Sequence, residues 1–138
     1  MKLQVGVKLC IRDKQGKILL LRRSPEKYPE TGAQWDIIGG RIDPGITLYE
    51  NLKREVKEEA GFTFEKEVRL LNVQDVLRDG KKHVVRLTFI ASVSKRPKIR
   101  LSEENDEYKW FSLEELNKLK KRQVDMFFKE IVDKKFIS

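Results

Sequence analysis

Apolar positions in the first third of the chain are grouped into short β-prone stretches. Residues 3–12 and 17–23 are rich in apolar side chains, and the turn-forming residues 13–16 separate them, so together they predict a β-hairpin. Residues 24–34 contain two prolines and a glycine, which indicates a loop. Residues 35–38 resume a short buried strand in front of two glycines.

A helix is predicted from Thr47 to Ala60. Thr47 is followed three residues later by Glu50, which is a capping-box pattern, and Gly61 suits the left-handed residue that ends a helix. At about 100° per residue, five apolar side chains fall in one sector that must be the buried face. These side chains are Leu48, Tyr49, Leu52, Val56 and Ala60.

The remainder of the chain alternates between the two-residue period of a strand and the 3.6-residue period of a helix. Residues 68–77 and 83–94 predict two strands, and residues 108–111 predict a further short one. Residues 113–119 and 124–131 carry apolar residues at helical spacing and predict closing helices. The fold class is therefore α/β, a mixed β-sheet covered by helices in a single domain of 138 residues.

The charge balance points to phosphate-bearing partners. The 30 Lys and Arg exceed the 22 Asp and Glu, which gives a formal net charge of +8, with basic clusters at residues 95–100 and 118–135. The longest apolar run, residues 18–21, is far shorter than the roughly 20 residues that cross a bilayer, and no signal peptide is visible. A cytoplasmic protein without membrane contact is expected, either a monomer or a homodimer. Cys10, the single cysteine, is interpreted as core packing.

Carboxylates crowd the inner edge of the predicted helix. Glu59 projects between apolar positions, with Glu55 beside it and Glu58 on the shoulder. Like charges at this spacing repel, so a cation is needed, and carboxylate oxygens are suitable ligands for Mg²⁺ or Mn²⁺. The alternative is that Arg54, Lys57 or a basic neighbour neutralises the acidic face. Gly39 and Gly40, directly after the predicted strand at residues 35–38, permit close approach of the backbone to a ligand, and the turn at residues 43–45 leads from them into the helix.

Residues 40–62, GRIDPGITLYENLKREVKEEAGF, resemble the Nudix box, G-x5-E-x7-R-E-U-x-E-E-x-G-U, where U is a bulky aliphatic residue. Seven positions match in place: Gly40, Arg54, Glu55, Val56, Glu58, Glu59 and Gly61. The resemblance implies an α/β/α sandwich and hydrolysis of a nucleoside diphosphate linked to another moiety, with Mg²⁺ or Mn²⁺ as cofactor. It implies that metal ions neutralise charge at the diphosphate and activate the attacking water.

The same resemblance assigns roles to residues. It implies metal ligation by the box glutamates and by the backbone carbonyl of Gly40, and a later carboxylate, Glu107, as ligand or base. Glu55, oriented by Arg54, is the chosen general base. The expected catalytic residues are Glu55, Glu58 and Arg54; the expected metal ligands are Glu55, Glu58, Glu59, Gly40 and Glu107; the expected substrate-binding residues are Arg23, Arg22 and Gly39. Arg23 resembles the phosphate-contacting arginine of several relatives, and Arg22 is the alternative, because neighbours on a strand point to opposite faces.

One position departs from the family pattern. Ile46 stands where the family has its first glutamate, whose role is to pair with the arginine that matches Arg54. Glu50, one helical turn before Arg54, is the expected substitute partner. His83 has no second metal ligand at suitable spacing and is interpreted as a surface residue.

The resemblance implies that the substrate is a small-molecule nucleotide, and the favoured hypothesis is a pyrophosphohydrolase of nucleoside triphosphates or oxidised nucleotides. Residues 77–80 lack the proline or tyrosine associated with ADP-ribose or dinucleoside polyphosphate hydrolases, which remain alternatives. The positive charge supports a further alternative, removal of pyrophosphate from RNA 5′ ends. The last alternative is a Nudix module that binds nucleotides without hydrolysing them.

Overall fold

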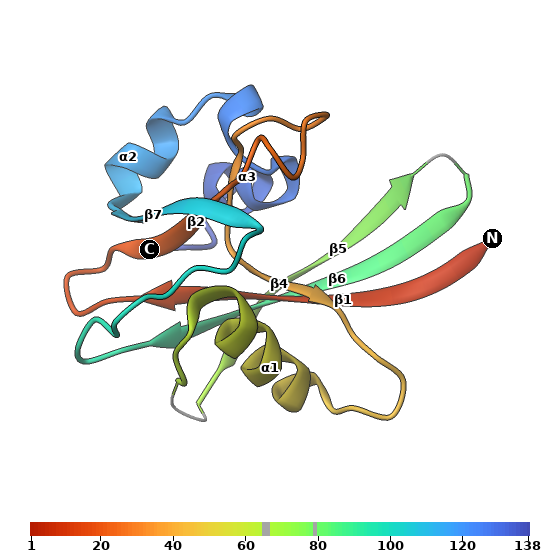
Figure 1. The fold of residues 1–138 in the computed structure, drawn as a ribbon, viewed down its shortest axis with the longest axis horizontal. Coiled ribbons are helices and arrows are strands. Elements are labelled where there is room, and N and C mark those ends of the chain that lie inside the picture. The colour runs from red at the N-terminus through yellow and green to blue at the C-terminus, as the bar shows by residue number, and fades with distance from the viewer. Residues whose placement is uncertain (65–66, 79) are drawn as a thin grey trace.

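The computed structural model describes residues 1–64, 67–78 and 80–138, arranged as a mixed sheet between helices (Figure 1). The elements in chain order are β1 (Lys2–Arg12), β2 (Ile18–Arg23), β3 (Trp35–Asp36), β4 (Ile38–Arg41), α1 (Leu48–Ala60), β5 (Arg69–Arg78), β6 (Lys82–Ser92), β7 (Asn105–Phe111), α2 (Leu113–Lys118), a 3₁₀ turn (Lys121–Gln123) and α3 (Met126–Asp133). Asp79, between the two strands predicted at residues 68–77 and 83–94, lies outside the described residues. The predicted hairpin of β1 and β2 is confirmed.

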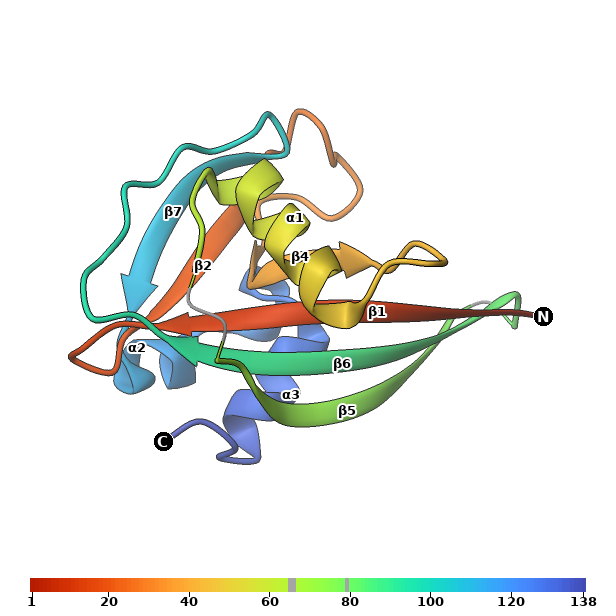
Figure 2. The same ribbon diagram turned by 90° about the horizontal axis from the view of Figure 1, so that it is seen from below.

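The sheet is built around β1. Its strand order is β3-β2-β1-β6-β5, while β4 pairs with β1 and β7 pairs with β2. β1 runs parallel to β6 from Lys2 to Arg12, and β5 is antiparallel to β6. The outer parts of these three strands extend away from the helices as an arm that carries the N-terminus (Figure 2).

The strand predicted at residues 35–38 is two strands. β3 pairs with β2, whereas β4 pairs with β1, and Ile37 lies between them. The prediction of a single straight strand is wrong, because the chain leaves its pairing with β2 at Ile37 and then pairs with β1. This passage leaves β4 and its two glycines beside α1.

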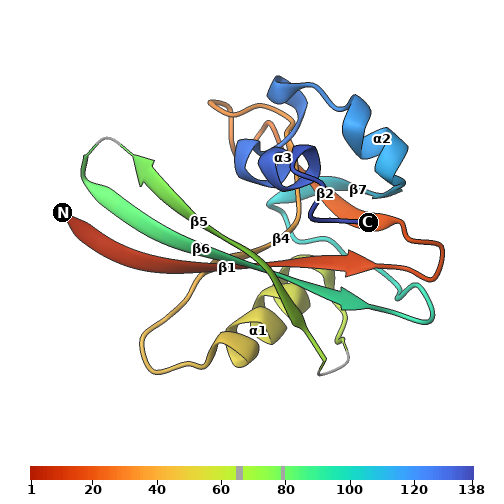
Figure 3. The same ribbon diagram turned by 180° about the vertical axis from the view of Figure 1, so that it is seen from behind.

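Helices cover both faces of the sheet, α1 on one side and α2 with α3 on the other (Figure 3). One apolar cluster joins α1 to the sheet through Leu52 and Val56, and the other joins α3 through Phe128 and Ile131. Cys10 is buried in the second cluster, as predicted. The predicted α/β/α sandwich is confirmed. Within the described part of the chain, no helix is long and apolar enough to cross a membrane.

The predicted helix and its ends are confirmed in α1. The Thr47 side chain accepts a hydrogen bond from the Glu50 N–H, and Gly61 ends the helix with φ of 75°. One predicted core residue is wrong, because Leu48 is 38% exposed and Asn51 is fully buried instead. The Asn51 amide satisfies the preceding loop: it donates to the Arg41 carbonyl and accepts from the Asp43 N–H.

The closing helices are confirmed with small changes in their bounds: α2 ends one residue earlier than predicted, and α3 lies two residues later. α3 begins at Met126 rather than at residue 124, because Asp125 caps it by accepting from the Phe128 N–H. Val124 precedes the helix and pairs with Trp35 in an isolated bridge. This contact brings the start of α3 to the edge of the sheet near Asp36, which matters for the site.

Candidate active site

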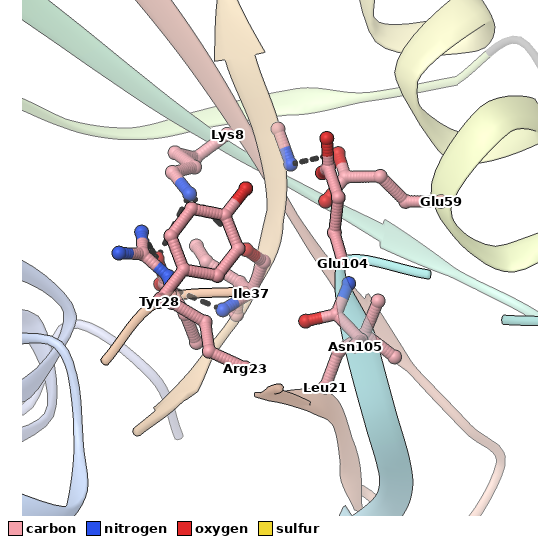
Figure 4. A pocket seen from close by; sticks show the side chains of 10 residues that line it. Lys8, Leu21, Arg23, Tyr28, Ile37, Glu59, Glu104 and Asn105 are labelled. Carbon is pink, nitrogen blue, oxygen red and sulfur yellow. Dashed lines mark hydrogen bonds and ion pairs between the residues drawn. The ribbon is translucent and has the colours of Figure 1, made fainter. Parts of the chain in front are cut away.

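Two adjoining cavities lie between the end of α1, the strands β1 and β4, and the start of α3. The first has a volume of about 160 Å³ and the second about 270 Å³. Lys8, Arg23, Asp36 and Gly39 line both, so the two cavities form one cleft. Figure 4 shows the first cavity, with Lys8 and Arg23 across from Glu59 and Glu104.

Glu59 is the acidic centre of the first cavity. Its carboxylate accepts a hydrogen bond of 3.2 Å from the Gly39 N–H. Burial raises the pKa of Glu59 to about 8, the carboxylates of Glu55 and Glu104 add to that rise, and the ammonium of Lys8 opposes it. Three carboxylates are therefore close together with too little positive charge between them.

Both glycines of β4 are required by close contacts. A Cβ atom on Gly40 would come within 2.8 Å of Glu55 Oε1, and one on Gly39, whose φ is 152°, would come within 2.1 Å of the Val7 carbonyl oxygen. Any side chain would separate β4 from α1 or from β1. The glycines thus let the backbone of β4 lie directly against the carboxylates of α1.

Arg54 is held by a different partner from the predicted one. Its guanidinium bonds to Asp43, to Asn51 Oδ1 at 3.1 Å and to Glu55 Oε1 at 3.3 Å. The hydrogen bond that Arg54 donates to the Asp43 carboxylate is the main reason why the pKa of Arg54 is raised. The predicted pairing with Glu50 is wrong, because the Glu50 carboxylate bonds to the Thr47 hydroxyl at the helix cap. Asp43, in the loop before α1, therefore takes the role of the missing acid.

The choice between the two arginines of β2 is resolved by their neighbours. Arg23 lines both cavities and lies 5.3 Å from the centre of the Tyr28 ring. Arg22 points elsewhere: it bonds to Asp106 at 2.9 and 3.0 Å and lies 3.4 Å from Glu107. Of the two predicted phosphate contacts, only Arg23 is in the cleft.

The later carboxylate in the cleft is Glu104, not the predicted Glu107. Glu104 lines the first cavity with Glu59, whereas Glu107 is half-exposed and faces Arg22. Glu58 is exposed on α1, and neither Glu58 nor Glu55 is among the residues that line the two cavities. The contacts place Glu55 against Gly40 and Glu59 against Gly39, whereas Glu107 faces Arg22.

The sequence analysis missed a buried charge network behind β4. Asp36 Oδ2 lies 2.9 Å from Lys8 Nζ and 3.7 Å from Arg23 Nη2, and Asp36 Oδ1 lies 3.7 Å from Arg86 Nη2. Arg86 Nη1 also contacts Asp125 Oδ2 at 3.0 Å. Burial alone would raise the pKa of Asp36, but the charges of Lys8 and Arg86 hold it below its usual value. Charged residues inside otherwise apolar strands were the signal that could have revealed them.

The acidic end of the cleft fits a divalent cation. Glu55 and Glu59 supply hard oxygen ligands in close contact, and the pKa of Glu59 is raised first by its burial and then by the neighbouring carboxylates. Among the described residues no three Asp, Glu, His or Cys side chains form a ready-made cluster. Mg²⁺ is commonly held by one or two carboxylates with substrate phosphates, so two carboxylates suffice.

Comparison with known proteins gives a consistent result. The NUDIX domain model matches residues 2–130. The nucleoside triphosphatase NudI of Escherichia coli K12 is 28% identical over 113 residues, which cover 73% of this chain and 77% of NudI. The chain also resembles the crystal structure of the MutT protein from Methanosarcina mazei Go1, with a TM-score of 0.81, 29% identity and coverage of 96% and 92% of the two chains.

A more distant structure shares the fold alone. The Ap4A hydrolase of C. elegans is 24% identical with a TM-score of 0.65, covering 94% of this chain and 93% of its own. Because the family model spans nearly the whole chain, the resemblance of residues 40–62 to the box is part of a full-length match. The chain belongs to the Nudix family and is a hydrolase of phosphoanhydride bonds.

Proposed function

We propose that this protein hydrolyses nucleoside triphosphates, oxidised ones included, to the monophosphate and pyrophosphate, with Mg²⁺ or Mn²⁺ as cofactor. The observation that carries the proposal is the polarity of the cleft, where Glu59 and Glu104 stand opposite Lys8 and Arg23. A triphosphate with a divalent cation matches both ends, since it carries negative charge for the lysine and arginine and a cation for the glutamates. The similarity to NudI supports the same substrate class.

The residues of the cleft divide the chemistry between them. Glu55 and Glu59, together with the Gly40 carbonyl and Glu58, are the candidate ligands of the cation, which when bound neutralises charge on the phosphates and acidifies the attacking water. Arg54 orients Glu55 by a hydrogen bond of 3.3 Å, so Glu55 is placed to accept the proton of that water.

The bond changes balance as follows. The water oxygen forms a bond to phosphorus while the bridging P–O bond breaks, and pyrophosphate leaves with the electron pair of that bond. The water proton passes to a carboxylate, for which Glu55 is the candidate. Arg23 and Lys8 line the cleft and are placed to stabilise the negative charge that develops on the phosphate oxygens.

The test is hydrolysis by the purified protein across chemically distinct substrates. The panel contains nucleoside triphosphates, 8-oxo-dGTP, ADP-ribose, a diadenosine polyphosphate and 5′-triphosphorylated RNA, each with Mg²⁺, with Mn²⁺ and with chelator. We expect metal-dependent turnover in which triphosphates rank first by kcat/KM. Higher kcat/KM for ADP-ribose, the diadenosine compound or RNA would replace the proposed substrate, and turnover that persists in chelator would exclude the proposed cofactor.

A further inference from the structure

The second cavity contains a buried arginine that is only partly satisfied. Arg86 comes from β6, lines this cavity and has only 8% of its side chain exposed. Its Nη1 contacts Asp125, but Nε and Nη2 have no hydrogen-bond partner within the described part of the chain. Asp36 Oδ1 lies 3.7 Å from Arg86 Nη2, which is beyond hydrogen-bond range. Buried donors without partners are rare and destabilising, so this arginine calls for an acceptor.

The two free donors of Arg86 belong to one edge of the guanidinium. Arg22 shows what this edge does elsewhere in the same protein: its Nε and Nη2 bind the two carboxylate oxygens of Asp106 at 2.9 and 3.0 Å. The edge therefore suits a ligand with two neighbouring acceptor atoms. Asp125 keeps the other end of the Arg86 guanidinium engaged, so the two-donor edge is what remains for a ligand.

The immediate surroundings of Arg86 suit a neutral, flat ligand. Asp36 and Asp125 line the cavity beside Arg86, and their negative charges offset that of its guanidinium. Of the other basic residues in the lining, Lys8 and Arg23 are shared with the first cavity, where the phosphates are proposed to bind, and Arg41 bonds to Gln4. The rest of the lining includes Val76, Val84 and the ring of Phe127, which lies 5.6 Å from the guanidinium carbon. A cavity of about 270 Å³ with apolar walls and a few fixed polar groups is typical of a site for a heteroaromatic ring.

We propose that the second cavity binds the base of the nucleotide and selects guanine and cytosine through the two-donor edge of Arg86. This inference rests on the proposed function, because the cavity adjoins the site proposed for the phosphates through Lys8, Arg23 and Gly39. Guanine presents O6 and N7 side by side, and cytosine presents O2 and N3. Adenine and thymine have a donor or a carbon beside each acceptor, and 8-oxoguanine carries a hydrogen on N7, so each satisfies only one of the two N–H groups and 8-oxo-dGTP is expected to be hydrolysed less efficiently than dGTP.

The first experiment needs no variant. We compare kcat/KM for dGTP, dCTP, dATP and dTTP, and for 7-deaza-dGTP, which lacks only the N7 acceptor. We expect dGTP and dCTP to exceed dATP and dTTP by about tenfold, and 7-deaza-dGTP to lose most of the advantage of dGTP. Equal values for the four nucleotides, preference for adenine or thymine, or an undiminished 7-deaza-dGTP would each overturn the proposal.

Binding of the monophosphates separates this proposal from the proposed function. Titration calorimetry with dGMP, dCMP, dAMP and dTMP measures base preference without any hydrolysis. Tighter binding of dGMP and dCMP in a protein that hydrolyses no triphosphate would support the base site and refute the proposed function. Hydrolysis of all triphosphates with equal binding of the four monophosphates would do the reverse.

A matched pair of variants assigns the effect to Arg86. Arg86→Lys keeps the positive charge but removes the two-donor edge, whereas Arg96→Lys makes the same change outside both cavities. We expect the advantage of dGTP over dATP to fall to about twofold or less in Arg86→Lys and to stay unchanged in Arg96→Lys. Retention of the full advantage in a folded Arg86→Lys protein would overturn the assignment. If that variant does not fold, the 7-deaza-dGTP comparison decides.

Discussion

Two groups of carboxylates face the same cleft, and their pKa values are shifted in opposite directions. On the α1 side, the pKa of Glu59 is raised to about 8 by burial, with Glu55 and Glu104 adding to the rise. Behind β4, the pKa of Asp36 is lowered, because the positive charges of Lys8 and Arg86 outweigh the effect of burial. The α1 group thus lacks a cation, while the Asp36 group already has its own.

The difference suggests a division of labour within one cleft. Charges that are already paired hold their surroundings rigid, as Asp36 does for Lys8. Charges left unpaired are destabilising until a ligand arrives, which makes the α1 side the place where binding energy is gained. Substitutions in the α1 group should therefore mainly lower activity, whereas substitutions in the Asp36 group should mainly lower the free energy of unfolding.

The largest expected effect is on activity, at Glu59. Glu59→Gln removes a candidate ligand and should lower kcat by about a thousandfold, while the free energy of unfolding stays the same or rises because a repelling carboxylate is gone. Steady-state hydrolysis of a triphosphate and urea denaturation measure the two quantities. Glu50→Gln, an exposed change on the same helix, is the control and should leave both almost unaltered. A Glu59→Gln protein that loses stability but keeps its activity would reverse the comparison.

The second prediction concerns stability, at Asp36. Asp36→Asn leaves Lys8, Arg23 and Arg86 around a neutral amide and should lower the free energy of unfolding by about 3 kcal/mol. Asp106→Asn is the matched control, because it also breaks a pair with an arginine, but the Asp106 side chain is 35% exposed against 7% for Asp36. Its expected loss is about 0.5 kcal/mol. Equal losses in the two variants, measured by urea denaturation, would contradict the view that the Asp36 network is structural.

The third prediction uses pH. The folded-state pKa of Glu59 lies above its unfolded value of 4.5, so its contribution to stability is present below pH 4.5 and is lost as pH rises through about 8. In chelator, the free energy of unfolding of the wild type should fall relative to Glu59→Gln across this window, by about 2 kcal/mol once partial exposure is allowed for. Saturating Mg²⁺ should remove most of that fall. Urea denaturation at several pH values, with and without Mg²⁺, measures this difference in the free energy of unfolding. A difference that does not change with pH would contradict a raised pKa of Glu59 in the folded protein.

The acidic side of the cleft was predictable because its parts are close in sequence. Glu55 and Glu59 are one helical turn apart on α1, and the glycines of β4 come shortly before it, so a single motif contains them. The resemblance favoured Arg23 as the arginine that faces the cleft, but the sequence could not exclude Arg22. Alternation along a strand shows that the two side chains point to opposite faces, not which of these faces is covered. Only the packed sheet decides that Arg23 is inside.

The basic side was not predictable, because its members come from separate segments. Asp36, Arg86 and Asp125 lie on β3, β6 and the cap of α3, and no spacing along the chain relates them. Glu107 is the direct partner of Arg22 across β2 and β7, so the two side chains lie on the same face of the sheet, away from the cleft. Glu104 precedes β7 and lines the first cavity, and the hydrophobic pattern of this segment does not show which of the two carboxylates reaches the cleft.

The smallest expected effect is at the position that departs from the box. Ile46→Glu restores the family acid, but Arg54 already bonds to Asp43, Asn51 and Glu55. A second acid near a satisfied and partly exposed guanidinium adds little, so we expect stability within about 0.5 kcal/mol of the wild type and kcat within about twofold. In Asp43→Asn, where the present partner is weakened, the same Ile46→Glu change should become clearly stabilising. A sharp loss of both stability and activity in Ile46→Glu alone would instead assign a packing role to the half-buried Ile46 side chain. If Ile46→Glu has no effect either in the wild type or in Asp43→Asn, Arg54 does not depend on a carboxylate from this loop. The excess of negative charge at Glu55 and Glu59 would then arise within α1 itself.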